Sequence, residues 1–148
     1  MILTNMKIIE KDLLTVESGI ICHQCNCLGS MGGGIALAIK NKWPVVYRTY
    51  RDTYDRQGLR LGEIQLVKVS DNLIVCNMMC QKYFGREPRL YTDYDAVRTA
   101  FKKLHDTIGR TTQIYIPMNM GCGLAGGDWN EYSRIVDFYC PGVIACKL

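Results

Sequence analysis

The sequence lacks the apolar run of about 18 residues that a membrane-spanning helix requires. Residues 1–11 do not contain the apolar stretch of an export signal. Internal repeats, low-complexity tracts and linkers are absent as well. A chain of 148 residues with this profile is expected to form a single domain, residues 1–148, with one ligand cleft. We therefore expect a cytoplasmic protein with no membrane partner.

The sequence also lacks a block of like charges. It has 18 Lys and Arg against 14 Asp and Glu, a net charge of +4, and the basic residues are spread along the chain. Lys82, Arg86 and Arg89 flank one loop, where a solvated face is expected. Such a distribution gives little support for nucleic-acid binding, but it supplies a modest attractive field for an anionic nucleotide.

A second Cys-x-x-Cys pair is missing too. Cys22 and Cys25 enclose His23, but no partner pair stands at zinc-ribbon spacing, and neighbouring strand residues point to opposite faces. The eight cysteines lie in apolar runs or beside a glycine-rich turn. We expect reduced, mostly buried thiols, and neither a metal nor a cofactor.

What the sequence does contain is a glycine-rich turn between a strand and a helix. Residues 19–22 form a short β-branched run typical of a buried strand, and Ile35, Ile39 and Trp43 recur at helical spacing. Between them lie glycines at 29, 32, 33 and 34. Glycines let backbone N–H groups approach a ligand, and the helix that follows directs its N-terminal dipole at an anion. The turn therefore predicts a site for a phosphate or phosphosugar.

A second turn of the same kind follows the strand expected at residues 113–117. Residues 118–127 contain glycines at 121, 123, 126 and 127, and a periodic helix begins at Trp129. In an α/β sheet, ligands bind at the carboxyl ends of the strands. Both turns are therefore expected to meet at one cleft large enough for a diphosphate.

Strands and helices alternate along the chain. Thr92 and Asp95 suggest a capping arrangement for a helix that ends at Gly109, and Asp128 is expected to cap the last helix. A tight turn at residues 70–72 predicts an antiparallel strand pair on either side. These patterns predict a three-layer α/β/α sandwich with a mixed sheet. Strands are expected at 7–10, 19–24, 63–69, 73–79, 113–117 and 142–147, and the other helices at 33–41, 45–56 and 129–138.

The two turns resemble those of macro domains, the family that binds ADP-ribose. Residues 23–36 read HQCNCLGSMGGGIA and are most similar to the branch that contains the yeast-type ADP-ribose 1''-phosphate phosphatase. Weaker similarity extends from Asp12 through Phe84 to Trp129. The resemblance implies the macro fold and an ADP-ribose-type nucleotide as partner. We expect a monomer. The resemblance also implies a ligand-binding set of Asp12, Leu13, Ser30, Met31, Gly32, Gly33, Gly34, Ile35, Met120, Gly121, Cys122, Gly123, Leu124 and Ala125.

Two residues are candidates for chemistry. Asn26 stands where macro domains hold the distal ribose, although an Asx-turn residue is an equal reading of the sequence alone. His23 is expected to act as acid/base or to orient the attacking water, against the alternative of a buried core histidine. At the place of the family's adenine-stacking ring the chain has Cys146.

The resemblance leaves three functions open. The first is hydrolysis of ADP-ribose 1''-phosphate, which would use His23. The second is removal of ADP-ribose from protein or nucleic acid through Lys82, and it is weakened because Ala125 replaces the Asp that some such members carry. The third is a non-catalytic reader or sponge for ADP-ribose. Nucleic acid enters only as a modified substrate in the second.

Overall fold

The computed structural model describes residues 6–109 and 111–148. A six-stranded mixed sheet lies at its centre in the order β1-β6-β5-β2-β4-β3. All neighbouring strands are parallel except β3 and β4, which pair antiparallel as the tight turn between them predicts. The strands are β1 (Lys7–Glu10), β2 (Gly19–Asn26), β3 (Ile64–Lys68), β4 (Leu73–Gln81), β5 (Ile114–Pro117) and β6 (Ile144–Lys147).

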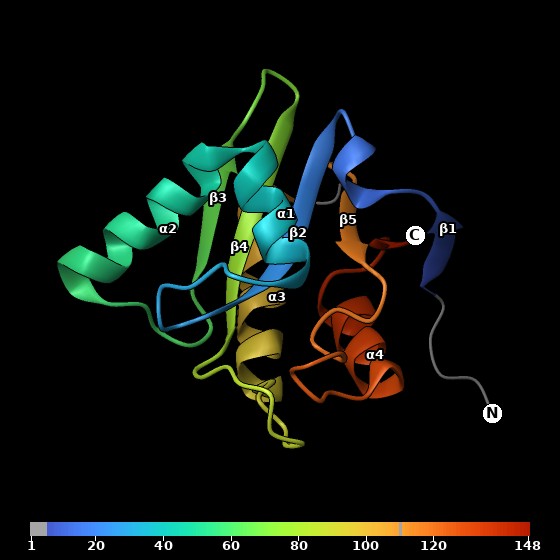
Figure 1. Ribbon diagram of the computed structural model, residues 1–148. Helices are drawn as coiled ribbons and strands as arrows, with labels where there is room; N and C mark the ends of the chain where they lie inside the picture. Colours follow the sequence, from blue (N-terminus) through green and yellow to red (C-terminus); the bar gives the residue numbers. More distant parts are fainter. Residues whose placement is uncertain (1–5, 110) are drawn as a thin grey trace.

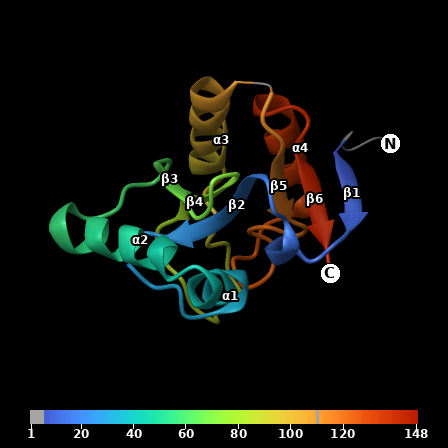
Figure 2. The same ribbon diagram turned by 90° about the horizontal axis from the view of Figure 1, so that it is seen from above.

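Helices cover both faces of the sheet. Figure 1 shows α1 and α2 in front of the central strands, and Figure 2 shows α3 and α4 together on the opposite side. This confirms the expected three-layer α/β/α sandwich with a mixed sheet. The helices are α1 (Gly34–Lys42), α2 (Pro44–Gln57), α3 (Tyr94–Ile108) and α4 (Trp129–Tyr139), with a short 3-10 helix η1 at Leu13–Thr15.

The core is divided into two clusters by the alternation of side chains along each strand. In β2, Ile20 and Cys22 pack toward α3 and α4, whereas Ile21 and Cys25 pack toward α1 and α2. The expectation that Cys22 and Cys25 point to opposite faces is therefore confirmed. All eight cysteines are free thiols, and seven are buried.

The structure confirms one of the two helix caps expected from the sequence and corrects the other. Asp128 caps α4 as expected, because its carboxylate accepts the N–H groups of Asn130 and Glu131 at 2.8 and 3.3 Å. The expected cap of α3 is wrong. Asp93, not Thr92, accepts the Ala96 N–H at 2.9 Å, and the Thr92 hydroxyl bonds outside the helix. Asp takes this role because its carboxylate reaches the second and third N–H groups of the first turn.

In the part of the chain that the structure describes, no helix is long and apolar enough to cross a membrane.

Candidate functional site

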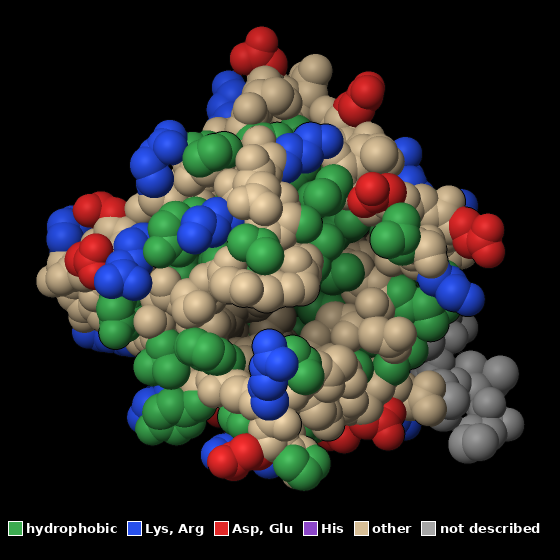
Figure 3. Space-filling view, viewed as in Figure 1, with side chains coloured by type: hydrophobic (Ala, Val, Ile, Leu, Met, Phe, Trp, Pro, Cys, Tyr) green, Lys and Arg blue, Asp and Glu red, His purple; other side chains and the backbone are tan. Residues whose placement is uncertain are grey.

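A cleft of about 700 Å³ opens at the carboxyl ends of β2 and β5. One wall is the first glycine-rich turn, residues 26–36, and the facing wall is the second turn, residues 117–125. Figure 3 shows this face of the molecule hollowed near its centre. The expectation that both turns meet at one cleft is confirmed, and the volume lies within the range of about 300–1,000 Å³ typical of small-molecule sites.

Asn26 organises the first turn from within. Its Oδ1 accepts the Leu28 N–H at 3.0 Å and the Tyr50 hydroxyl at 2.8 Å, and its Nδ2 donates to the Ser30 carbonyl at 2.8 Å. A side-chain amide carries two donor hydrogens, so one N–H of Asn26 is still available to the cleft that the residue lines. Asn26 therefore combines the Asx-turn role with a place in the site.

The N-terminus of α1 lies in the same wall. Gly33 precedes the helix and offers no side-chain cap, whereas α3 and α4 are capped by Asp93 and Asp128. The first N–H groups of a helix have no partner inside it, and they carry the positive end of the dipole. Gly33, Gly34, Ile35 and Ala36 all line the cleft. An anion can therefore take the position that an acidic cap occupies in the other two helices.

The second turn has an unusual backbone. Asn119 has a φ of 65°, the only positive value among described residues other than glycine. Gly121, with a φ of 70°, allows no Cβ, since that atom would lie 2.5 Å from the Tyr132 ring. At Gly123, by contrast, an added Cβ meets no atom within 4 Å. The turn is tightly packed behind Gly121 and open toward the cleft at Gly123.

The electrostatics of the cleft favour an anion. Among the described lining residues Arg86 is the only charged one, and its guanidinium forms no ion pair within the described chain. The other polar groups are mainly the amides of Gln24, Asn26, Gln81 and Asn119. Neutral donors together with one cation attract a negative ligand without placing a carboxylate against it.

The structure does not bring His23 to this cleft, which corrects the expected acid/base role. Its ring is fully buried on the α1–α2 side of β2, and its Nε2 donates to Asn77 Oδ1 at 2.6 Å. Asn77 donates in turn to Gln65 Oε1 at 3.0 Å, which fixes the orientation of its amide. Burial lowers the pKa of His23 to about 4, against the smaller opposing effect of the Asn77 hydrogen bond.

Position along β2 explains this difference. His23 and Asn26 both lie on the α1–α2 side of the sheet, since the Asn77 amide that holds His23 donates to Val46 in α2 and Asn26 accepts the Tyr50 hydroxyl from the same helix. His23, however, lies three residues before the end of the strand. A β-bulge at Cys25 and Asn26 then shifts the register, so that Asn26 pairs with Gln81. Cys25 lines the cleft, and its Sγ lies 3.6 Å from His23 Nε2. Burial raises the pKa of the Cys25 thiol, which is therefore protonated.

Four more expected ligand residues do not line the cleft. Asp12 accepts the Leu14 N–H at 3.0 Å and caps η1, and the Leu13 side chain is buried in the core. Met31 is 2% exposed because it packs under α1 and α2. The Cys122 thiol turns to the Met120 carbonyl at 3.2 Å. The expected residues that do line the cleft are Asn26, Ser30, Gly32, Gly33, Gly34, Ile35, Met120, Gly121, Gly123, Leu124 and Ala125.

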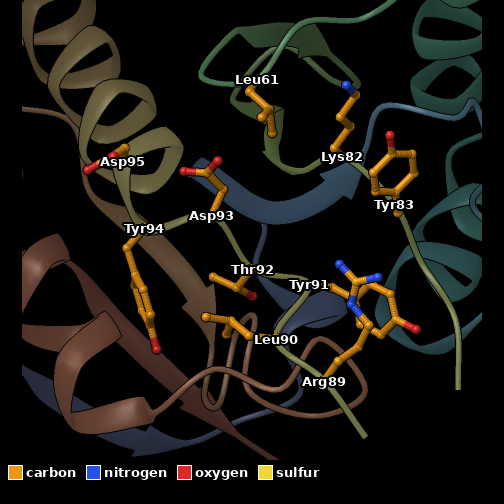
Figure 4. Close-up of a pocket in the computed structure, with 10 residues that line it drawn as sticks. All are labelled: Leu61, Lys82, Tyr83, Arg89, Leu90, Tyr91, Thr92, Asp93, Tyr94 and Asp95. Atoms are coloured by element: carbon orange, nitrogen blue, oxygen red, sulfur yellow. The ribbon is translucent and has the colours of Figure 1, made fainter. Parts of the chain in front are cut away.

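Lys82 belongs to a different pocket. Figure 4 shows it beside Tyr83 and Leu61, in a cavity of about 450 Å³. Its Nζ lies 5.4 Å from the Tyr83 ring centre. The preceding residue, Gln81, lines the main cleft instead. Lys82, the residue on which the hydrolase alternative depends, therefore lies outside the main cleft, and its neighbour at the cleft is an amide without a nucleophilic amine.

The sequence reasoning missed half of the cleft lining. Residues 84–91 form a third wall, and no regular pattern in that segment indicates it. The only local signal was the Phe84-Gly85 pair, which belongs to the family resemblance. Gln24 lies on the α3–α4 side of β2, since its Oε1 accepts the Tyr132 hydroxyl, whereas Asn26 accepts the Tyr50 hydroxyl of α2. The missed residues are Gln24, Cys25, Ala36, Gln81, Phe84, Gly85, Arg86, Tyr91, Pro117, Met118 and Asn119.

Within the residues that the structure describes, no group of three or more His, Cys, Asp or Glu is arranged to hold a metal ion.

Comparison with known proteins defines the class. No family model matches the chain. The fold superposes on a macrodomain protein from Streptomyces coelicolor with a TM-score of 0.79 and 25% identity, over 97% of this chain and 99% of the other. It also superposes on a protein of unknown function from Bacteroides thetaiotaomicron with a TM-score of 0.86 and 31% identity, over 98% and 99%. The chain is a macro domain.

Within the macro domains, the sequence is similar to enzymes named ADP-ribose 1''-phosphate phosphatase. It is 28% identical to the one from Saccharomyces cerevisiae over an alignment of 166 positions, which covers 91% of this chain and 93% of that protein. A shorter match to the Aspergillus oryzae protein of the same name has 47% identity over 47 residues. That match covers 31% of this chain and 23% of the other.

Proposed function

We propose that the cleft binds ADP-ribose 1''-phosphate and hydrolyses it to ADP-ribose and inorganic phosphate. The observation that carries the proposal is the meeting of two glycine-rich turns around one cleft of about 700 Å³. The similarity to proteins named for this reaction supports the choice of substrate.

The diphosphate of the ligand fits the uncapped end of α1. The first-turn N–H groups from Gly34 onward lack intrahelical partners and belong to residues that line the cleft, and Gly33 leaves the approach free of a Cβ. The open backbone of the second turn around Gly123 supplies further N–H groups from the facing wall. We expect the diphosphate to lie between these two walls, since no carboxylate among the described lining residues repels it.

The distal ribose fits beside Asn26. The amide is held by Ser30, Leu28 and Tyr50, so its remaining N–H is oriented before the ligand arrives. A donor fixed in this way loses little conformational freedom on binding. This agrees with the distal-ribose role that the family resemblance implies for Asn26.

The reaction requires mainly that the substrate phosphate and a water molecule are correctly positioned. A water oxygen forms a bond to phosphorus, the bond between phosphorus and the C1'' oxygen breaks, and that oxygen receives a proton from the water. The products are ADP-ribose and hydrogen phosphate. Phosphoryl transfer depends on positioning and on stabilising negative charge, which the amides of Asn26 and Gln81 and the Arg86 guanidinium can supply from the cleft. His23 is buried outside the cleft and has no part in this proton transfer.

A second candidate is ADP-ribose binding without catalysis. It is favoured by one observation, namely that the described lining residues include no His, Lys, Asp or Glu to act as a general acid or base. Such a site would read or sequester the nucleotide.

The test is to incubate the purified protein with ADP-ribose 1''-phosphate, ADP-ribosylated protein and ADP-ribosylated DNA, and to measure release of phosphate and of ADP-ribose. We expect phosphate from the first substrate only. The variant Gly33→Val serves as the control, because its Cβ enters open space and should block the cleft without disturbing the fold. Binding of ADP-ribose with no product from any substrate would establish the second candidate. Release of ADP-ribose from a macromolecule would contradict both.

A further inference from the structure

Thr92 connects Gln24, which lines the cleft, to the second glycine-rich turn. The residue is 3% exposed and lies just before the Asp93 cap of α3, between Tyr91 and Asp93 in Figure 4. Its hydroxyl donates to the Gly121 carbonyl at 2.7 Å and accepts from Gln24 Nε2 at 2.8 Å. One buried hydroxyl thus bonds to a strand on one side and to a ligand-lining turn on the other.

The backbone beside Thr92 holds the other end of the same turn. The N–H groups of Tyr91 and Thr92 both donate to the Ala125 carbonyl, at 2.7 and 3.1 Å. Gly121 and Ala125 both line the cleft and bracket the open residue Gly123. The segment 121–125 is therefore attached at its two ends to the residues that precede α3.

Gln24 extends this arrangement into the sheet. Its Nε2 also donates to Gln81 Oε1 at 2.9 Å, and its Oε1 accepts the Tyr132 hydroxyl at 2.8 Å. The amide thereby has a partner at each oxygen and nitrogen position. Among the described residues no buried side-chain nitrogen or oxygen lacks a hydrogen-bond partner. Removing one side chain of this hydrogen-bond network therefore leaves other buried polar groups with fewer hydrogen-bond partners.

We propose that Thr92 is a positioning residue that holds the second turn in the shape that binds the nucleotide diphosphate. The inference rests on the proposed function, because the turn must contact the ligand for its shape to matter. Without the hydroxyl, the Gly121 carbonyl keeps only the Gly127 N–H at 2.9 Å, and Gln24 loses one of its two acceptors. The turn can then depart from the binding geometry, and part of the binding energy is spent on ordering it again.

The experiment compares Thr92→Val, which keeps the shape of the side chain and removes the hydroxyl, with Thr92→Ser, which keeps the hydroxyl. Thr107→Val is the matched control, since the Thr107 hydroxyl is exposed and bonds only to Lys103 in its own helix, at 2.7 Å. Calorimetry with ADP-ribose should show about a tenfold weaker Kd for Thr92→Val, the loss expected for about one net hydrogen bond. Thr92→Ser and Thr107→Val should remain within about twofold of the parent.

Amide hydrogen exchange on the ligand-free protein separates this proposal from the proposed function. Exchange in residues 119–127 should be faster in Thr92→Val than in the parent, and unchanged in Thr92→Ser. If the parent does not bind ADP-ribose, the proposed function fails while the exchange result still decides the role of Thr92. An unchanged exchange rate in Thr92→Val, or equal loss of affinity in Thr92→Val and Thr92→Ser, would overturn the proposal. If Thr92→Val does not fold, Thr92→Ala replaces it in the same comparison.

Discussion

Acidification should destabilise the protein through His23, and the effect can be isolated. The folded state holds the ring neutral because burial lowers its pKa to about 4, whereas the ordinary value is 6.5. As the pH falls below 6.5, His23 binds a proton in the unfolded chain but not in the folded chain, so the free energy of unfolding falls. The loss stops growing below the folded pKa, where both states carry the proton.

The size of the effect follows from these two values. Linkage gives a loss of about 2 kcal/mol between pH 7 and pH 5, and of about 3 kcal/mol in total once the pH is below both pKa values. A loss of 2 kcal/mol is a large share of the stability of a single domain, which is typically about 5–15 kcal/mol.

The assay is urea unfolding at pH 7, 6 and 5 under reducing conditions, with the parent and with His23→Gln. The variant cannot take up the proton, so its unfolding free energy should fall by about 2 kcal/mol less than that of the parent across this range. Contributions from the other titratable groups are common to both proteins and cancel in the difference. Equal pH dependence in the two proteins would refute the reasoning. The same neutral ring predicts that the pH profile of phosphate release contains no inflection due to His23.

Three further predictions concern the cleft. Gly33→Val and Gly123→Val should fold, because neither glycine has a positive φ and an added Cβ meets no protein atom within 4 Å. Both variants should lose most ADP-ribose affinity in calorimetry, because the added side chain blocks the cleft. Gly121→Val, whose Cβ would lie 2.5 Å from Tyr132, should instead fail to fold by circular dichroism. Parent-like binding by both cleft variants would place the site elsewhere. Asn26→Ala should raise Kd and lower kcat, by about tenfold or more each, since the amide contacts the bound ligand and stabilises the negative charge of the transition state more strongly than that of the ground state; an unchanged kcat would remove Asn26 from the chemistry. Lys82→Ala should leave phosphate release unaltered, because its amine lies in the neighbouring pocket; loss of activity on an ADP-ribosylated macromolecule in this variant would favour the hydrolase alternative.

The sequence predicted those features that depend on short-range patterns. The six strands and the four α-helices lie within two residues of their expected bounds, although the cap of α3 was misassigned and the short helix η1 was not expected. Glycines at 32, 33, 34, 121 and 123 were correctly placed in one cleft, because a glycine cluster between a strand and a helix has a restricted set of uses. The carboxyl ends of parallel strands then bring the two turns together.

What the sequence could not supply depends on orientation and on tertiary contact. The motif that contains both His23 and Asn26 suggested one site, but His23 pairs with Asn77 further back along β2, whereas Asn26 lies at the end of the strand and lines the cleft. Thr92 appeared to be a helix cap, since the residue types at a cap and at a turn anchor are the same. Its actual partner, Gly121, is distant in sequence and is brought near only by the folded sheet. The wall formed by Phe84, Arg86 and Tyr91 likewise exists only in the folded chain.

The most direct test of the central claim is calorimetric titration of the protein with ADP-ribose, with and without EDTA, beside Gly33→Val. We expect saturable binding at one site per chain, unchanged by the chelator, because backbone N–H groups and the α1 dipole hold the diphosphate. Gly33→Val, folded by circular dichroism, should give little or no heat. An absence of heat with the parent protein, binding abolished by EDTA, or undiminished binding by Gly33→Val would contradict the account.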